Sequence, residues 1–454
     1  MKRVLIISYY WPPNGGAGVY RWLKMSKYLP EFGWQPVVYT PENPEVVAED
    51  PGLLKDVGAA VEVVKHPITE PFSLYKRFTG RAQSERVQTA FLSEKRTGGW
   101  KEDIALWVRS NFFIPDARVW WVKPSIRYLK DYVRKHPVDA IISTGPPHSM
   151  HLIARGLQRA TGLPWIADFR DPWTGIDFYG QLALTTWADR KHHRLEREVL
   201  TTADRVVTVS WSWAKDLEAL GAKNVAVVTN GFDRADVPRT TVALDERNSL
   251  VHIGSMSATR DLPGLWRALA AIGQQDPAFR ETFVLRFVGP VDHSVVESAT
   301  AAGLGGHIER LGRVSHAEAM REMQRARVLL LPINDTPNSA GILPGKLYEY
   351  LSVGPHPRGG AVHGRCGPCV GRCASGVPLC TRSGPPCPHP GAVRDHHPRR
   401  GAGHGAVRSP GAGAGHGRRA ERLCHPGPIA AYFRTPRMGI IARQATQNTV
   451  LAYL

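Results

Sequence analysis

Short runs of apolar and β-branched residues alternate with helix-like segments from the start of the chain. Valine- and isoleucine-rich runs favour strands, and the segments between them carry apolar residues three and four positions apart. This alternation is typical of a parallel sheet covered by helices. The runs are VLIIS at 4–8, VVYT at 37–40, AIIST at 140–144, WIADF at 165–169, VVTVS at 206–210 and VAVVT at 225–229. We therefore predict a Rossmann-like α/β domain over residues 1–235.

A second set of patterns follows a connection rich in Gly, Asp and Pro at residues 229–240. Its predicted strands begin at Leu250, Phe283, His307 and Val328, and its helices span 262–272 and 317–325. A chain of 454 residues with 43% apolar content can bury two cores. We predict a linker over residues 236–247 and a second Rossmann-like domain over 248–354, incomplete because it has only four strand candidates.

The composition changes abruptly after Gly354. Residues 355–454 contain 14 Arg, no Lys, one Asp and one Glu, which is a net charge of +12 out of +18 for the whole chain. Residues 355–427 hold 16 Gly and 11 Pro, a composition that cannot offset the entropy lost on folding. We predict a disordered, low-complexity tail over residues 355–454. All six cysteines lie in it, and a cysteine-free body suits the cytosol.

Two other interpretations of the tail come from its residue types. The stretch CGPCVGRC places Cys366, Cys369 and Cys373 at a spacing seen in zinc sites, but no second matched pair of ligands accompanies them. The basic charge would suit nucleic acid, yet only Tyr432 and Phe433 are available to stack on bases. We predict neither a metal site nor a nucleic-acid partner.

Two glycine-containing turns are candidates for binding phosphate. The first predicted strand is followed by PPNGGAGVYR, with Gly16 and Gly18 before a helix that we expect to start near Val19. Glycine allows a ligand close to the backbone, and a helix N-terminus attracts an anion. Many strand-to-helix turns contain glycine for steric reasons alone, and the spacing is not that of a dinucleotide site.

The second turn is AGILPGKLYEYL, beginning at Ala340. Pro344 suits the first turn of a helix, and Lys346 and Glu349 would share one face of that helix. Lys346, together with Arg260 and Ser255 in the loop after the strand at Leu250, could bind a pyrophosphate, while Glu349 accepts ribose hydroxyls. The alternative is that Lys346 and Glu349 form only a solvated helical pair.

Polar residues also follow two strands of the first domain, at the end of the sheet where ligands bind in this architecture. STGPPHSMH supplies His148 and His151, and DFRDPW supplies Asp168, Arg170 and Asp171. The two aspartates flanking Arg170 are either acceptor-side groups or a structural ion pair. His148 is either a catalytic residue or a solvent-exposed turn residue.

The segment from Arg81 to Lys135 mixes basic residues with Trp107, Phe112, Trp120 and other aromatics. Such a mixture suits an anionic membrane surface or an amphipathic acceptor, or else it packs against its own domain. No apolar run approaches the ~20 residues that cross a bilayer, and VLIIS is a buried strand and not a signal peptide. We expect a cytoplasmic protein that contacts the inner face of the plasma membrane peripherally.

Taken together, these motifs resemble bacterial nucleotide-sugar-dependent glycosyltransferases of family 4, which have the two-domain GT-B fold. The resemblance covers residues 1–354. It is carried by ISYYWPPNGGAGVYR, STGPPH, PWIADFRDPW, TNGFD and GILPGKLYEYLSVG, in this order and at this spacing. It implies a hexosyltransferase-type enzyme.

The resemblance also implies roles for individual residues. Gly16 and Gly18 would face the donor phosphates, Arg260 and Lys346 would neutralise the leaving nucleotide diphosphate, and Glu349 would hold the ribose. The reaction would retain anomeric configuration without a metal or other cofactor, with the nucleotide sugar as a substrate. A lipid-linked or glycan acceptor of the cell envelope or an exopolysaccharide would receive the sugar.

This chain departs from the family pattern at two positions. The first carboxylate of the family's Glu, seven residues, Glu signature falls on Gly341, so one contact to the donor sugar is missing. The family histidine that approaches the donor sugar would align near Thr144, and we assign its role to His148, four residues later.

Family members continue after EYLSVG with a buried strand and further βα units, which the tail does not resemble. The codons for residues 354–360, read one nucleotide later, can spell Pro-Ile-Leu-Ala-Val, a strand of the kind the fold needs next. Our hypothesis is a frameshift near Gly354, testable by resequencing the gene. The alternative function is then a non-catalytic nucleotide-binding remnant of such an enzyme.

Overall fold

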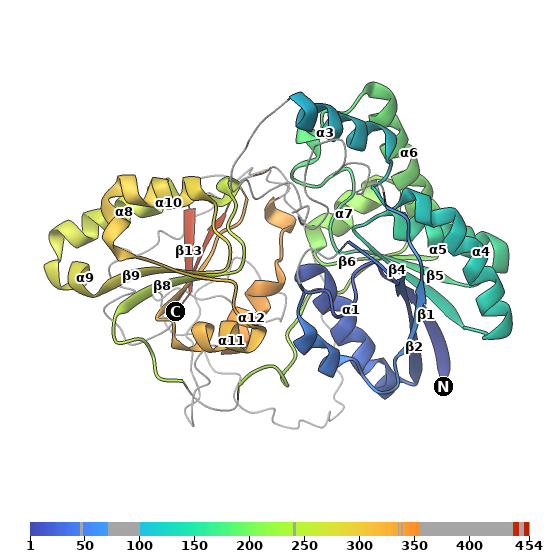
Figure 1. The fold of residues 1–454 in the computed structure, drawn as a ribbon, viewed down its shortest axis with the longest axis horizontal. Coiled ribbons are helices and arrows are strands. Elements are labelled where there is room, and N and C mark those ends of the chain that lie inside the picture. The colour runs from blue at the N-terminus through green and yellow to red at the C-terminus, as the bar shows by residue number, and fades with distance from the viewer. Residues whose placement is uncertain are drawn as a thin grey trace, which may run out of the picture. The chain divides into compact units, whose positions relative to one another are not determined.

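The computed structural model of the protein describes residues 1–45, 49–70, 100–238, 242–334, 336, 339–353, 439–444 and 449–453. Residues 1–355 belong to one compact unit, which holds two α/β sheets. The two sheets and their helices confirm the predicted α/β class with two Rossmann-like halves (Figure 1). The cysteine stretch CGPCVGRC, residues 355–438 of the tail and residues 71–99 lie outside the described residues.

The first sheet has seven parallel strands in the order β3-β2-β1-β4-β5-β6-β7. All six predicted strands are present, and β3 is an addition at the sheet edge, with the mixed sequence EVVKH. The strands are β1 Lys2–Ile7, β2 Trp34–Pro41, β3 Glu62–His66, β4 Ala140–Gly145, β5 Trp165–Phe169, β6 Arg205–Thr208 and β7 Val225–Val227. The order reverses at β1, between β2 and β4, where parallel α/β sheets bind ligands at the carboxyl ends of the strands.

Helices follow the strands of this sheet, and several begin at side-chain caps. Thr185 accepts a hydrogen bond from the Ala188 amide at the start of α6, and Ser210 caps α7 in the same way. The helices are α1 Ala17–Tyr28, α3 Trp100–Phe112, α4 Val119–Lys135, α5 Ser149–Thr161, α6 Thr186–Thr202 and α7 Trp211–Ala219. The predicted start of the first helix near Val19 is therefore two residues late.

Large aromatic side chains join the helices to the first sheet. Trp121 on α4 stacks on Tyr39 of β2 with ring centroids 4.9 Å apart, and its indole donates to the Pro67 carbonyl. Trp165 on β5 is fully buried and donates to Ser143 on β4. The contacts of Trp121 fix α4 against one face of the sheet, and the Trp165 hydrogen bond joins β5 to β4.

The second sheet has the order β10-β9-β8-β11-β12-β13. Its first four strands are those predicted, all parallel: β8 Asn248–Ile253, β9 Phe283–Val288, β10 Ile308–Gly312 and β11 Val328–Leu331. Two further strands come from the tail and were not predicted. β12 Gly439–Gln444 pairs in parallel with β11, and β13 Thr449–Tyr453 pairs antiparallel with β12.

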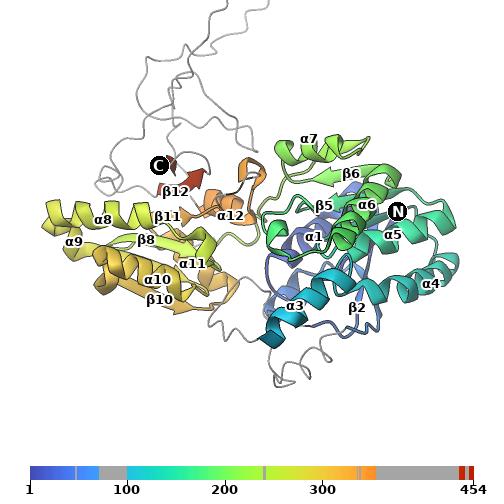
Figure 2. The same ribbon diagram turned by 90° about the horizontal axis from the view of Figure 1, so that it is seen from above.

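Helices cover both faces of the second sheet (Figure 2). One core contains Trp266 of α8 and packs beneath α8, α9 and α10; the other contains Met323 and Tyr350 and lies beneath α11 and α12. The helices are α8 Pro263–Gln275, α9 Pro277–Thr282, α10 His293–Ala299, α11 His316–Arg325 and α12 Gly345–Val353. β7 ends at Val227 and β8 begins at Asn248, so the predicted linker lies between the sheets. The predicted domain boundaries themselves stay a prediction.

Replacing Trp266 should strongly destabilise the second sheet. Its side chain is fully buried, and its indole donates to the Asp261 carboxylate over 2.7 Å. We expect Trp266→Ala to lower the free energy of unfolding in urea by about 3–5 kcal/mol, through lost burial and the cavity left behind. Trp211→Ala is the matched control, because this indole is 52% exposed, and it should cost less than about 0.5 kcal/mol. Equal losses in the two variants would contradict the described packing.

Candidate functional site

The glycine turn after β1 leads directly into α1. Gly16 is the residue before the helix and has φ +96°, a conformation that strongly favours glycine. Gly18 lies close against the Tyr10 ring, and its carbonyl accepts a hydrogen bond from Arg170. Arg170, which follows β5, thus contacts the first predicted phosphate turn directly.

Asp168 lies at the carboxyl end of β5 and is completely buried. Its oxygens accept hydrogen bonds from the Arg21 guanidinium at 3.0–3.3 Å, from the Trp22 indole at 2.7 Å and from the Thr144 hydroxyl at 3.0 Å. Arg21 also donates to the Val228 carbonyl at 2.9 Å. An ion pair does form, as one interpretation of the sequence required, but its cation is Arg21 of α1 and not the neighbouring Arg170.

Arg170 and Asp171 point to different partners. The Arg170 guanidinium donates to the carbonyls of Gly18 and Pro146, and it lies 5.6 Å from the Tyr10 ring centroid. Burial raises the pKa of the Asp171 carboxyl, while Arg170 opposes that rise. Asp171 makes no hydrogen bond to another described residue, so its carboxyl remains available at the end of the sheet.

His148 is buried, so the interpretation as a solvent-exposed turn residue is wrong: the residue is only 7% exposed. Its ring stacks on Trp173 at 4.7 Å and 5°. His151, one turn further along α5, shares a hydrogen bond of 2.8 Å with the Ser143 hydroxyl through Nδ1. Burial lowers the pKa of His148 well below its usual value and that of His151 to about 3, so both imidazoles are neutral at pH 7.

In the second sheet, cations gather at the carboxyl end of β8. Gly254 follows β8 with φ +111°, and a Cβ there would be 3.7 Å from the Lys346 side chain. Burial, together with the positive charges of Arg260 and Lys346, lowers the pKa of His252 to about 4. The structure therefore brings Arg260, from the loop after β8, and Lys346, from α12, to the same strand end. Ser255 is exposed beside them.

Lys346 and Glu349 lie on one face of α12, as their spacing predicts. The ammonium is 2.6 Å from the carboxylate, and both side chains are partly exposed. A helical ion pair at this spacing typically contributes about 0.2–0.5 kcal/mol. The pair therefore costs little to separate, and either group can turn to a ligand.

Asparagines connect this cluster to the first half of the chain. Asn334 accepts a hydrogen bond from Arg260 at 3.0 Å and donates to Asp177, in the loop after β5. Asn230 accepts from Arg21 at 3.2 Å and donates to the Leu343 carbonyl, just before α12, at 3.3 Å. No motif in the sequence marks Asn334 or Asp177, and Asn230 is marked only as part of the TNGFD motif. No pattern of spacing pairs residues so far apart in the chain.

Gly341 lies in the short turn Ser339–Gly341 and is buried. A Cβ at this position would overlap the indole of Trp213 on α7. Because Trp213 occupies the adjoining space, a carboxylate side chain at residue 341 would require the indole to move. The departure from the family signature thus has a steric counterpart in the described structure.

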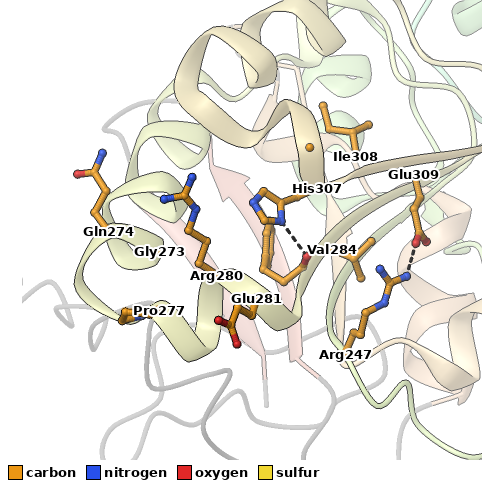
Figure 3. A pocket seen from close by; sticks show the side chains of 12 residues that line it. Arg247, Gly273, Gln274, Pro277, Arg280, Glu281, Val284, His307, Ile308 and Glu309 are labelled. Atoms are coloured by element: carbon orange, nitrogen blue, oxygen red, sulfur yellow. Dashed lines mark hydrogen bonds and ion pairs between the residues drawn. The ribbon is translucent and has the colours of Figure 1, made fainter.

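An open cavity of about 790 Å³ lies elsewhere on the second sheet (Figure 3). Its lining includes Arg280, His307 and the Arg247–Glu309 ion pair. Phe283 and Ile308, which also line it, are the first residues of β9 and β10. This cavity is therefore at the amino ends of the strands, whereas Arg260 and Lys346 lie at the carboxyl end.

Residues 15–231 match the model of the glycosyl transferase 4-like domain, which is just under half of the chain. This part holds the glycine turn, the His148 loop and the DFRDPW segment. Residues 15–231 therefore form a glycosyl transferase 4-like domain. No curated protein sequence matches it.

Solved structures of low sequence identity also resemble the chain. Sucrose-phosphate synthase from Thermosynechococcus elongatus is 15% identical over 73% of this chain and 75% of its own, with a TM-score of 0.45. HepE of Anabaena in complex with UDP and glucose is 12% identical over 78% and 79%, also with a TM-score of 0.45. WaaG, a glycosyltransferase of lipopolysaccharide biosynthesis, is 13% identical over 77% and 79%, with a TM-score of 0.44. The assignment of the glycosyl transferase 4-like domain rests on the match over residues 15–231.

The buried histidines should make the protein less stable below pH 6.5. In the unfolded chain His151 takes up a proton near pH 6.5, whereas in the folded protein its pKa is about 3. The stability is thus fully present above pH 6.5 and is lost as the pH falls toward the folded pKa. Between pH 7 and 5 this one residue should account for a loss of about 2 kcal/mol.

We expect His151→Gln to reduce the difference in unfolding free energy between pH 7 and pH 5 by about that amount. Urea titrations at the two pH values measure it. His293→Gln is the control, since the His293 side chain is 70% exposed on α10, and it should leave the difference unchanged. If both variants behave like the parent protein, the assignment of a neutral His151 is incorrect.

Proposed function

We propose that the protein transfers a sugar from a nucleotide diphosphate donor to a cell-envelope or exopolysaccharide acceptor. The observation that supports this most is the pair of cations, Arg260 and Lys346, at the carboxyl end of β8 beside Gly254. Two cations and a close glycine backbone suit a pyrophosphate. In this proposal Glu349 holds the ribose and the turn at Gly16 and Gly18 faces the phosphates.

The proposed chemistry retains the anomeric configuration and uses no metal or other cofactor. The bond between the anomeric carbon and the diphosphate oxygen breaks, and a bond to the acceptor oxygen forms on the same face of the sugar. The acceptor hydroxyl gives its proton to the departing diphosphate, whose negative charge Arg260 and Lys346 stabilise. Catalysis then consists of positioning the two substrates and stabilising the leaving group.

Asp168, Arg170 and Asp171 supply the proposed acceptor side, and His148 is the proposed catalytic residue beside the donor sugar. Asp171 is supported by its half-buried carboxyl without a described hydrogen-bond partner, which is suited to accept from a sugar hydroxyl. His148 is supported by its neutral, buried imidazole, which can bind a hydroxyl without adding charge near the donor. Asp168 acts indirectly, by positioning its neighbours, because its oxygens already accept hydrogen bonds from Arg21, Trp22 and Thr144.

We place the reaction in the cytoplasm, with peripheral contact between the enzyme and the inner face of the plasma membrane. Among the described helices, none is both long and apolar enough to span a bilayer. A lipid-linked acceptor would be reached at the membrane surface. The alternative function, a nucleotide-binding remnant, differs from this proposal only in lacking sugar transfer.

Removing the charged pair on α12 should abolish nucleotide binding. We expect the parent protein to be stabilised by about 2.7 kcal/mol at a nucleotide diphosphate concentration of 100 times Kd, measured as a thermal shift. Lys346→Ala and Glu349→Ala should each remove most of this shift, because a ligand contact is lost with either group. UDP, GDP and ADP are the probes, tested singly.

The matched control is Lys215→Ala with Glu218→Ala, which has the same spacing on the exposed face of α7. It should leave the shift intact. A full shift in the α12 variants would refute the proposed donor site. A shift in the parent protein with neither sugar transfer nor donor hydrolysis would favour the remnant.

A further inference from the structure

An apolar surface is exposed at the junction of α3, α4 and α6. Four large side chains contribute to it: Trp107 at 42%, Phe112 at 61%, Trp120 at 47% and Trp187 at 58% exposure. Soluble proteins seldom expose several large aromatic residues together unless the surface binds something. One interpretation of the sequence was that the aromatic residues of this segment pack against their own domain. Trp121 does so and is buried in the core, whereas Trp107, Phe112 and Trp120 are exposed.

Contacts in the structure join these residues into one patch. The rings of Trp107 and Phe112 are 5.9 Å apart, and Phe113, the next residue, lies 5.1 Å from Trp120. Asn111 connects α3 to the start of α6, because its amide accepts from the Thr185 backbone at 2.6 Å and donates to the Ala183 carbonyl at 3.1 Å. Trp187 therefore stands beside the end of α3.

Cations continue from this patch along α4. Starting at Trp120, the residues three, seven, ten and fourteen positions later are Lys123, Arg127, Lys130 and Arg134, a spacing that keeps them on one face. All four are exposed, while the buried face of α4 carries Trp121, Ser125, Leu129 and Val133. We refer to Lys123, Arg127, Lys130 and Arg134 as the α4 stripe.

The α4 stripe is short of counter-ions. Arg134 pairs with Asp131 at 3.3 Å, an exposed contact. Lys123, Arg127 and Lys130 have no carboxylate partner among the described residues. They line a recess of about 390 Å³ together with Ile126 and Asp131. At the other end of the patch, the Lys191 ammonium lies 4.8 Å from the Trp187 ring centroid, so a further cation borders the aromatics.

We propose that the aromatic patch and the α4 stripe form a docking surface for an anionic phospholipid bilayer. Tryptophan and phenylalanine are suited to the boundary between head groups and acyl chains, and a row of lysine and arginine is suited to the phosphates. The α4 stripe is complementary in charge to an anionic surface, and the aromatic patch lies at one end of it. A lipid surface would use both features, whereas a water-soluble polyanion would need no aromatic patch. The inference concerns a surface separate from the donor site, and it rests on the proposed function only for its biological use.

Vesicle sedimentation with the full chain tests the surface. Vesicles of phosphatidylcholine alone are compared with vesicles that contain about one third phosphatidylglycerol, at low and high salt. We expect binding only to the anionic vesicles, and weaker binding at high salt. A triple variant, Lys123→Glu, Arg127→Glu and Lys130→Glu, should bind at least about 100-fold more weakly, since each cation near an anionic surface contributes about a factor of five.

The matched control is Lys215→Glu, Lys223→Glu and Arg267→Glu, which makes the same charge change at exposed positions off the surface. It should keep most of the affinity. The basic tail is present in every variant, so the difference between the two triple variants reports on the α4 stripe. Equal loss in both, or no binding of the parent protein to anionic vesicles at low salt, would overturn the proposal. Binding to a soluble polyanion such as heparin without binding to vesicles would also overturn it.

A second measurement reports on the aromatic patch directly. All 13 tryptophans precede residue 267, so none lies in the tail, and tryptophan quenching by brominated phospholipids reports only on the body of the protein. We expect quenching in the parent protein and its loss in the variant Trp107→Phe, Trp120→Phe, Trp187→Phe. Trp211→Phe, which removes an exposed tryptophan elsewhere, should leave the quenching unchanged. Quenching that persists in the triple variant would show that the membrane contacts another face.

Discussion

The ligand-binding edge of the first sheet depends on the buried ion pair between Asp168 and Arg21. A charge without solvent is stable only when its lone pairs are bonded, and here Arg21, Trp22 and Thr144 provide the donors. These donors come from α1 and β4, so the carboxylate fixes the helix that follows the glycine turn against the centre of the sheet. Loss of either charge would leave the other buried alone, which typically costs about 3–5 kcal/mol.

Hydrogen bonds link the same ion pair to the second half of the chain. Arg21 bonds to Asn230, and Asn230 bonds to the carbonyl of Leu343 immediately before α12. The helix that carries Lys346 and Glu349 therefore begins at a point fixed by residues of the first 231. In the neighbouring loop, Asn334 stands between Arg260 and Asp177. Asn230 and Asn334 thus join residues of the first sheet's loops and helix α1 to the segments that carry the proposed donor groups.

The sequence allowed most strands and the local pairing of residues to be predicted, because both depend on short-range periodicity. β3 was missed since EVVKH mixes charged residues with valine, and β12 and β13 were missed because the composition of the tail gave no expectation of strands. Lys346 and Glu349 share a face as their spacing requires. By contrast, the partnership of Asp168 with Arg21 joins residues 147 positions apart, and the indole against Gly341 comes from α7. Such contacts depend on tertiary packing, which no local pattern encodes.

The strand order of the first sheet has a consequence for how the protein is made. Central strand β1 is flanked by β2 and β4, and the last strand of the sheet, β7, ends at Val227. Since domains generally fold in order as they leave the ribosome, this sheet has all its strands before the codons for β8 are translated. A mutation in the gene downstream of Val353 would therefore alter the second sheet, and the first sheet would already have formed in the nascent protein.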